Sequence, residues 1–383
     1  MTRTILVVTG TRAEYGLLQS SMAAITDHEA LSLEVVVTGM HLSPQHGHTA
    51  DEIEADGFEV SREVYMLLEG DTGTAMAKSL GIGITGMADA IHDLEPDVVM
   101  VLGDRDEALA AGVAAAHMNI PVAHIHGGQS MSGAIIDDSI RHALTKFAHI
   151  HFPVSELSAS RIRKLGEEPW RITTVGAPGL DAVLDADFTS SDTLRERLDL
   201  PADEPFALVI QHSVTTEADQ AGQQMRATLE AILEADLQAV VVYPNADPGG
   251  KRMIEVIDSF GDDRLRPFDN LPRADFLGCM AAADVMVGNS SSAIIEAPSF
   301  ELPVVDVGPR QEGRERAENT LSVPHDRDAI RQAIRRCLED DAVRRRSAEC
   351  ENPYDYGGAG DRIAERLAEF ELNKKLLQKQ LTY

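Results

Sequence analysis

The sequence is poor in cysteine and has no long apolar runs, and each shortage argues against a class of protein. Its three cysteines, Cys279, Cys337 and Cys350, form no CxxC pair and have no histidine partner pattern. A structural zinc site and a disulfide framework are therefore not expected. Apolar runs stay far below the ~18 residues that cross a bilayer, and residues 1–8 are too short a run for a secretory signal. We expect a cytoplasmic protein with no membrane partner.

Basic residues are also scarce relative to acidic ones. The chain has 34 Lys and Arg against 63 Asp and Glu, which gives a formal net charge of −29. Such a field repels phosphate backbones, so nucleic-acid binding would need a local basic patch, and the sequence shows none. The acidic excess is scattered through the expected helices, which is typical of a salt-adapted, halophilic surface; an ordinary acidic enzyme is the alternative.

The 383 residues exceed what one hydrophobic core usually spans, so two domains are expected. Short β-branched runs alternate with segments that have apolar residues at helical spacing, which predicts repeated βαβ units and an α/β fold. The strands expected in the first half are 4–9, 33–38, 97–102, 121–125 and 149–153. Those expected in the second half are 206–211, 238–243, 284–288 and 303–307.

We predict a first domain over 1–178, a second over 179–358, and a C-terminal segment over 359–383 in which residues 359–381 form one amphipathic helix that packs back on the body of the protein; a free coiled coil is the alternative. Apolar residues of this tail include Leu367, Phe370, Leu372 and Leu376. Open parallel sheets bind ligands beyond the carboxyl ends of their strands, so we expect the active site in the cleft between the two domains.

Two candidate groups follow expected strands of the first domain. In GTRAEYG, Gly10 permits a tight turn and Arg12 stands at a helix N-terminus, where a phosphate is readily bound. The alternative is an ordinary turn with a salt bridge; the string is neither a Walker loop nor GxGxxG. Asp104, at the end of the third strand, is a candidate acid or base, or else a helix cap.

The run HIHGGQ, followed by DDSIRH, carries titratable groups from a strand end through a glycine loop into a helix. Asp137 and Arg141 are spaced i, i+4, which allows an ion pair that lowers the aspartate pKa or leaves Arg141 to hold a substrate anion. A lone helix salt bridge is the alternative. His124 and His126 have no third ligand nearby, so metal catalysis is not expected.

The second half carries further polar strand ends. His212 is placed to steady a departing diphosphate, with a buried core histidine as the alternative. Asn245, Arg310 and Arg314 lie in strand-end loops, and the two arginines suit anion binding. The serines that follow Gly288 at a helix start either cap the helix or hold a diphosphate, and one turn later a glutamate can accept hydrogen bonds from ribose hydroxyls. These three residues are Ser290, Ser291 and Glu296.

Taken in register over nearly the whole chain, eight strings resemble the UDP-N-acetylglucosamine 2-epimerase family, and most closely its hydrolysing branch of the sialic and legionaminic acid pathways. They are GTRAEYG, VTGMHLSP, GDRDEAL, HIHGG, DDSIRHALTK, QHSVTT, YPNAD and GNSSSAIIE. The resemblance implies two Rossmann-like domains in the GT-B arrangement, a homodimer or homotetramer, and no cofactor.

The resemblance also implies a reaction. A proton leaves C2 of the sugar as UDP is eliminated, and water then adds, so that the hydrolysing branch releases N-acetylmannosamine and UDP. At the positions that match the family motifs, the resemblance implies acid–base transfer by Asp104 and Asp137. It implies phosphate binding by Arg12, His212, Ser290 and Ser291, and ribose binding by Glu296. It also implies that Arg105 and Arg141 bind the substrate and orient carboxylates.

One departure from the family pattern concerns the catalytic glutamate. Many relatives carry it where this chain has His126 or Gln129, and the loop before Asp137 is one residue longer here. We hypothesise that His126 takes over the proton transfer, because an imidazole titrates near neutral pH. The alternative is that Gln129 marks altered or lost activity.

Other readings stay open. UDP-N-acetylglucosamine is the expected substrate, and UDP-N,N'-diacetylbacillosamine is the alternative. A non-hydrolysing epimerase, a GT-B glycosyltransferase and a non-catalytic UDP-sugar-binding protein are further alternatives, because one fold hosts several functions.

Overall fold

The chain forms two compact units in a computed structural model. The structure describes residues 2–43, 48–68, 72–130, 135–184, 186–202, 204–245 and 248–383. Unit 1 is formed mainly by Met1–Ser130 and Ala134–Ala182, and it also includes Tyr354–Tyr383. Unit 2 is formed mainly by Val183–Pro353. The tail of the chain therefore returns to the unit in which the chain begins.

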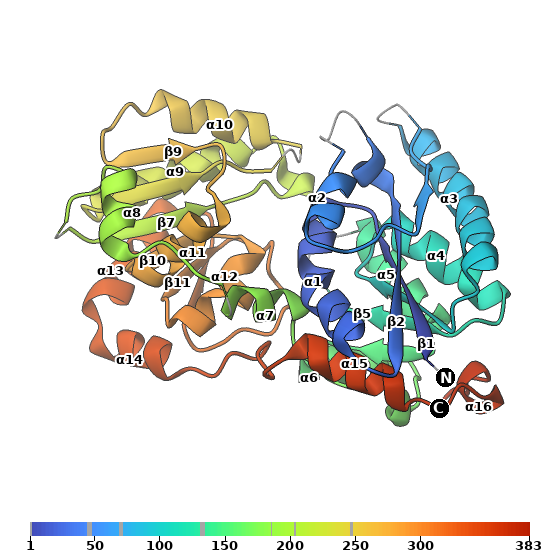
Figure 1. Cartoon of the computed structure of the whole chain (residues 1–383). Coiled ribbons are helices and arrows are strands. Elements are labelled where there is room, and N and C mark those ends of the chain that lie inside the picture. The colour runs from blue at the N-terminus through green and yellow to red at the C-terminus, as the bar shows by residue number, and fades with distance from the viewer. Residues whose placement is uncertain are drawn as a thin grey trace. The chain divides into compact units, whose positions relative to one another are not determined.

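Unit 1 is built on a parallel sheet with the strand order β3-β2-β1-β4-β5-β6 (Figure 1). Its strands are β1 (Arg3–Thr9), β2 (Leu31–Thr38), β3 (Arg62–Val64), β4 (Val98–Leu102), β5 (Val122–Ile125) and β6 (Ile150–Phe152). Its helices are α1 (Arg12–Asp27), α2 (Ala50–Ala55), α3 (Gly73–Leu94), α4 (Asp106–His117), α5 (Ile135–Phe147), α6 (Glu156–Lys164), α15 (Ala359–Glu369) and α16 (Lys374–Leu377), with short 3-10 turns η1 (Gly39–Leu42) and η3 (Pro169–Arg171). Helix α7 (Pro178–Leu184) contains the boundary to unit 2.

Unit 2 repeats this order with the strands β12-β11-β10-β7-β8-β9. Its strands are β7 (Phe206–Ile210), β8 (Gln238–Val242), β9 (Leu265–Phe268), β10 (Val285–Gly288), β11 (Val304–Val307) and β12 (Thr320–Val323). Its helices are α8 (Ser191–Arg197), α9 (Ala221–Glu234), α10 (Gly250–Ser259), α11 (Arg273–Ala282), α12 (Ser291–Ile295), α13 (Arg327–Glu339) and α14 (Asp341–Glu349), with η4 (Thr215–Glu217) and η5 (Ala297–Phe300). In both sheets the chain order reverses beside the first strand, which is the switch point where doubly wound sheets bind ligands.

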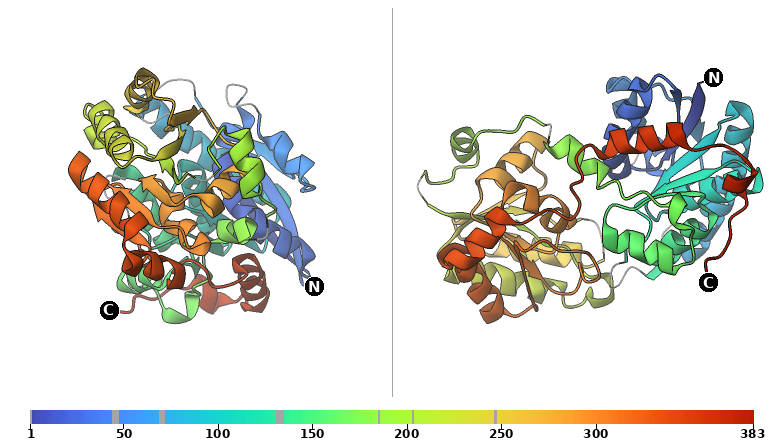
Figure 2. Two further views of the ribbon diagram at one scale, coloured as in Figure 1. Left: turned by 90° about the vertical axis from the view of Figure 1, so that its left-hand side faces the viewer. Right: turned by 90° about the horizontal axis from the view of Figure 1, so that it is seen from below.

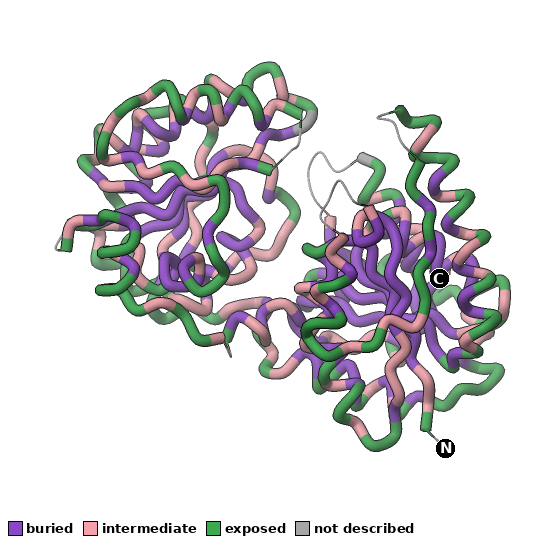
Figure 3. Tube along the Cα trace, turned by 45° about the horizontal axis from the view of Figure 1, so that its top comes forward, coloured by how far each residue is buried: buried purple, intermediate pink, exposed green. Residues whose placement is uncertain are grey.

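The central strands are apolar on both faces because helices cover both sides of each sheet. In β1, Ile5 and Val7 join one core cluster and Leu6 and Val8 join another. Figure 3 shows the strands of each unit as buried and the outer turns of the helices as exposed. The strands thus read in sequence as continuous apolar runs, and their polar residues are left to the strand ends.

The predicted α/β fold with two parallel sheets is confirmed, and each expected strand overlaps an observed one. The sequence analysis missed β3, β9 and β12, which are all edge strands. Between the predicted domain boundary and β7, the chain also forms α8, for which the sequence analysis gave no expectation. No helix in the described part of the chain has the length and apolar character of a membrane span.

The expected C-terminal helix does pack back, but it is shorter than predicted. Helix α15 lies beside α1 (Figures 1 and 2). The Asp181 carboxylate caps its start, accepting hydrogen bonds from the backbone N–H groups of Ala359 (2.9 Å) and Gly360 (2.8 Å). The helix ends at Glu369, and α16 follows after a break. Leu372, expected on the apolar face, falls in this break and is exposed.

Arg171 holds the tail in this broken conformation. Its buried guanidinium donates to the carbonyl oxygens of Leu376 (2.6 Å), Lys375 (2.8 Å) and Gln378 (3.4 Å). It also pairs with Glu168 at 2.8 Å. Carbonyl groups that point at a common cation cannot all follow one helix axis, so a continuous helix to residue 381 would lose these bonds.

We expect Arg171→Ala to lower the free energy of unfolding of unit 1 by about 3–5 kcal/mol, because several buried acceptors lose their donor. Urea unfolding followed by fluorescence of Trp170, the only tryptophan of the chain, measures this. Arg163→Ala is the control, since Arg163 makes an exposed pair with Glu156 at 3.3 Å, and it should change stability by less than about 1 kcal/mol. Equal effects of the two substitutions would contradict the role of Arg171.

Candidate active site

At the switch point of unit 1, the turn after β1 presents Arg12 as the first residue of α1. Thr11 caps this helix by accepting a hydrogen bond from the Glu14 N–H at 3.2 Å. The Arg12 side chain is 68% exposed and pairs with Glu52 of α2 at 2.9 Å. An exposed pair of this kind contributes little to stability, so Arg12 can exchange Glu52 for a ligand anion at small cost.

The turn after β4 presents Asp104, and Arg141 of α5 binds its carboxylate in an ion pair. Arg105, rather than Asp104, occupies the N-cap position of α4, so the alternative role of Asp104 as a helix cap is wrong. The Arg141 side chain is 3% exposed and also contacts Asp138 and, at 3.0 Å, the carbonyl oxygen of Gln129. One buried cation therefore joins the ends of β4 and β5 to the first turns of α5.

The pairs shown for Arg141 run to Asp104 and Asp138, whereas the sequence spacing pointed to Asp137. Asp137 lies exposed in the first turn of α5. Burial alone would lower the pKa of Arg105, but the nearby charges of Glu107, Glu14 and Asp137 raise it. Asp137 is therefore close enough to Arg105, which follows Asp104 after β4, for its negative charge to raise the pKa of that arginine.

His126 lies at the end of β5 in a left-handed backbone conformation, with φ of 65°. For a residue with a side chain this conformation is strained, and such strain is concentrated at functional sites. Its Nδ1 lies 3.3 Å from the Gln129 Oε1, which is an acceptor, so Nδ1 carries the hydrogen. In the neutral ring the lone pair is therefore on Nε2, as a proton acceptor requires.

His124, the other histidine of the HIH string, stabilises the fold beneath the site. It is fully buried, and its Nε2 donates to the Gly103 carbonyl oxygen at 2.8 Å. Burial lowers its pKa to about 3, so the ring is neutral. It therefore fixes the turn that carries Asp104. Among the described residues, no group of three His, Cys, Asp or Glu side chains is arranged to hold a metal ion.

Two buried glutamates beneath this site were missed by the sequence analysis. A Cβ atom added to Gly10 or Gly39 would lie within 2.6 Å of the Glu107 side chain, so both glycines are needed to admit it. Glu107 also contacts Arg105 at 3.3 Å. Beside it, the Glu14 carboxylate accepts the Gly10 N–H at 2.6 Å. The turns after β1, β2 and β4 are thereby held together, and only the glycines hint at this in the sequence.

In unit 2 the switch point lies between β7 and β10, and His212 follows β7. Its Nδ1 accepts the Asn245 N–H at 3.1 Å, which places the proton of the neutral ring on Nε2. Asn289, after β10, holds the backbone of His212 with its side-chain amide. His212 is only partly buried, so the alternative of a core histidine is wrong.

The serines after β10 begin the short helix α12. The Ser290 hydroxyl caps the helix through the Ser292 N–H at 3.4 Å, and Ser291 is its first residue. Glu296 ends the helix, and burial raises the pKa of its carboxyl to about 7, although Arg273 opposes this. In either protonation state the carboxyl offers an oxygen that can accept a hydrogen bond from a hydroxyl group.

The loop after β11 places Arg310 and Arg314 near this group. Arg310 donates to the carbonyl oxygen of Asn289 at 3.0 Å, and Gln311 donates to the same oxygen at 2.7 Å. Arg310 thus has a structural contact besides the predicted anion binding. The Arg314 N–H closes the loop on the Gln311 carbonyl oxygen at 3.3 Å.

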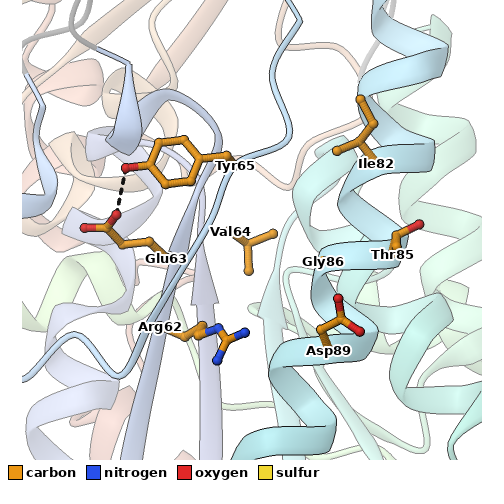
Figure 4. Close-up of a pocket in the computed structure, with 8 residues that line it drawn as sticks. All are labelled: Arg62, Glu63, Val64, Tyr65, Ile82, Thr85, Gly86 and Asp89. Atoms are coloured by element: carbon orange, nitrogen blue, oxygen red, sulfur yellow. Dashed lines mark hydrogen bonds between the residues drawn. The ribbon is translucent and has the colours of Figure 1, made fainter.

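A separate cavity of about 370 Å³ lies in unit 1 between β3 and α3 (Figure 4). It is lined by Arg62, Glu63, Val64, Tyr65, Ile82, Thr85, Gly86 and Asp89. The close-up shows Tyr65 turned toward Glu63, with a hydrogen bond of 2.8 Å. None of the predicted site residues lines this cavity.

Comparison with known sequences gives consistent matches over the whole chain. The family described as UDP-N-acetylglucosamine 2-epimerase matches residues 23–368. A Legionella pneumophila protein named UDP-N,N'-diacetylbacillosamine 2-epimerase (hydrolyzing) is 38% identical, covering 100% of both chains. A Neisseria meningitidis protein named UDP-N-acetylglucosamine 2-epimerase is 34% identical, covering 86% of this chain and 87% of the relative.

Solved structures share the fold. The Staphylococcus aureus protein MnaA with UDP matches with a TM-score of 0.80 and 22% identity, covering 96% of both chains. The Neisseria meningitidis UDP-GlcNAc 2-epimerase bound to UDP-GlcNAc matches with a TM-score of 0.81 and 18% identity, covering 96% of this chain and 100% of the other. The predicted GT-B fold is confirmed.

The buried Glu14 should make the free energy of unfolding depend on pH. Burial, reinforced by Glu107 and opposed by the Gly10 hydrogen bond, raises its pKa to about 8. The folded state therefore keeps a proton that the unfolded chain loses near pH 4.5, so stability is lost as pH rises from about 4.5 to 8. Relative to Glu14→Gln, the wild-type free energy of unfolding should fall by up to about 1.4 kcal/mol per pH unit in this window.

Urea unfolding at pH 5, 6, 7 and 8 measures the difference between the two proteins. Glu34→Gln is the control, because Glu34 is only partly buried in β2, and its difference from wild type should not change in this way. Parallel curves for wild type and Glu14→Gln would show that Glu14 is ionised in the folded protein.

Proposed function

Because this chain belongs to the UDP-N-acetylglucosamine 2-epimerase family, we propose that it is a hydrolysing 2-epimerase that converts a UDP-2-acetamido sugar into the free 2-epimeric sugar and UDP. The observation that carries the proposal is a chain of contacts: Arg141 binds both the Asp104 carboxylate and the Gln129 carbonyl oxygen, and the Gln129 side chain accepts from Nδ1 of His126, which leaves the imidazole lone pair on Nε2. The reaction needs a base for C2 and a second group that handles the proton when water adds.

We assign UDP-N,N'-diacetylbacillosamine as the first substrate, which was the alternative in the sequence analysis. The full-length similarity to the Legionella pneumophila protein supports this choice. UDP-N-acetylglucosamine is the second candidate, supported by the Neisseria meningitidis relative. The proposed homo-oligomeric state and cytoplasmic location stay predictions.

In the proposed mechanism, Asp104 removes the C2 proton and His126 delivers or accepts a proton as water adds. Asp137 supports this transfer from the first turn of α5. The bond from C1 to the diphosphate oxygen breaks as C2 loses its proton, and the resulting 2-acetamidoglucal takes up water. Arg12, His212 and the α12 serines stabilise the charge of the leaving UDP, because N–H and O–H donors are worth most where negative charge develops. Glu296 binds the ribose, and Arg105 and Arg141 orient the substrate and the acids.

The test is proton NMR of the reaction in D₂O with each UDP-sugar. We expect free UDP and a free 2-epimeric sugar that carries deuterium at C2. A retained UDP-sugar epimer would show a non-hydrolysing enzyme. Turnover that requires an acceptor sugar would show a glycosyltransferase, and the absence of any reaction would show a binding protein.

Asp104→Asn should lower kcat by about 10²- to 10⁴-fold, the usual contribution of a positioned acid or base. UDP affinity, measured by calorimetry, should change by less than about threefold, because the amide keeps the shape of the side chain. Asp138→Asn is the matched control, since Asp138 is the second carboxylate on Arg141, and it should retain most of kcat. If Asp104→Asn keeps more than a tenth of the wild-type kcat, Asp104 is not the base.

His126→Ala should lower kcat by at least about 100-fold, since its imidazole replaces the missing glutamate. Gln129→Glu distinguishes this from the alternative that Gln129 marks altered activity. If His126 is the working group, the wild type is active and Gln129→Glu gains little. A wild type that turns over neither sugar, together with a Gln129→Glu variant that does, would falsify the role of His126.

A further inference from the structure

Asn289 follows β10 in unit 2 and contacts residues that follow β7 and β11. Its side chain is fully buried. Its Oδ1 accepts the His212 N–H at 2.7 Å, and its Nδ2 donates to the His212 carbonyl oxygen at 2.9 Å. The amide thus pairs with both backbone groups of one residue, as a neighbouring strand would, just past the point where the β7–β10 ladder ends at Ile210 and Gly288.

The close approach of the two strands is what allows this pairing. Gly288 has φ of 138°, and a Cβ atom there would lie 2.1 Å from the Ile210 carbonyl oxygen. The Asn289 N–H donates to that same oxygen at 3.0 Å. This close approach brings the side chain of Asn289 within hydrogen-bonding distance of the His212 backbone.

Two other strand ends complete the arrangement. From the loop after β11, Arg310 and Gln311 donate to the Asn289 carbonyl oxygen at 3.0 and 2.7 Å. From the loop after β8, the Asn245 N–H donates to Nδ1 of His212 at 3.1 Å. The backbone of His212 is held by one neighbour and its ring by another, so the direction of the Nε2–H bond is fixed.

We propose that Asn289 is a positioning residue that holds His212 so that its Nε2–H points at the diphosphate of a bound UDP group. The inference rests on the diphosphate role of His212 in the proposed function. An amide suits the position because it offers a donor and an acceptor side by side. A carboxylate would set two acceptors against the backbone, and alanine would leave two buried backbone groups without partners.

Asn289→Asp tests this through pH. A protonated carboxyl has one donor and one acceptor, like the amide, whereas the ionised form has no donor for the His212 carbonyl oxygen. Burial beside that carbonyl favours the protonated form, and the neighbouring groups that can carry charge are the titratable ring of His212 after β7 and the guanidinium of Arg310 after β11. The Kd for UDP, measured by calorimetry, should therefore match wild type at pH 5.5 and be weaker by about tenfold at pH 8.5.

Asn289→Ala is the matched control and should weaken UDP binding by a similar factor at every pH. A double-mutant cycle with His212→Ala then separates positioning from general damage. If Asn289 acts through His212, its substitution in the His212→Ala background costs less than about twofold in Kd. Circular dichroism checks folding, and if Asn289→Asp unfolds at high pH, the cycle with Asn289→Ala decides.

A constant ratio of Kd values for Asn289→Asp and wild type across the pH range, or additive effects in the cycle, would overturn the proposal. Both readouts use UDP alone. A protein that binds UDP but turns over no UDP-sugar would therefore refute the proposed function and leave this inference standing, whereas an additive cycle in an active enzyme would refute only this inference.

Discussion

The site in unit 1 depends on the burial of one guanidinium. A buried cation must be paired, because its desolvation costs more than most single contacts return. Arg141 meets this requirement with Asp104, Asp138 and the carbonyl oxygen of Gln129. These partners come from the ends of two strands and from the helix itself, so satisfying Arg141 also fixes where Asp104 stands.

In unit 2, a neutral side chain positions the residue that follows the first strand. There the backbone of His212 lies just past the sheet, where its N–H and C=O groups have lost their ladder partners. The Asn289 amide supplies both bonds from a neighbouring strand end. A neutral amide suits the diphosphate-binding role proposed for His212, because a carboxylate at position 289 would repel such a ligand. The two units share a strand order, but the ion pairs of Arg141 position the residues after the strands in unit 1, and the neutral amide of Asn289 does so in unit 2.

The elements that were predictable from sequence are those whose signal is local. Central strands such as β1 and β7 are buried on both faces and read as apolar runs, and α3 and α4 have clear helical spacing. The missed strands are edges, with one neighbour and partly exposed residues. Strand β9 even contains a proline, Pro267, and β3 has three residues. Such segments become strands because the sheet offers a partner, which the sequence window does not contain.

For the candidate site, too, the sequence indicated the features with a local signal and missed those that depend on distant residues. Asp104 in unit 1 and His212 in unit 2 were candidates because each follows a strand, and the carboxyl ends of parallel strands meet at one edge of their own sheet. The contact of Arg141 with Asp138 was not anticipated, because i, i+3 and i, i+4 neighbours are equally close on a helix and the sequence spacing does not choose between them. Glu107 escaped notice because an acidic residue in the first turn of α4 looks like a favourable helix charge. Its burial depends on Gly10 and Gly39, far away in the sequence.

The charge balance around Arg141 also bears on why residue 129 is a glutamine. Asp104 and Asp138 already place two carboxylates on one guanidinium, and Asp137 adds a third negative charge nearby. A glutamate at 129 would add a fourth in a buried loop, where like charges raise pKa values and resist ionisation. Gln129 instead gives His126 a neutral acceptor for Nδ1–H, which sets the tautomer without drawing the ring proton away. In the proposed mechanism the proton-accepting lone pair is therefore on an imidazole instead of a carboxylate, and the ordinary pKa of an imidazole lies closer to neutral pH.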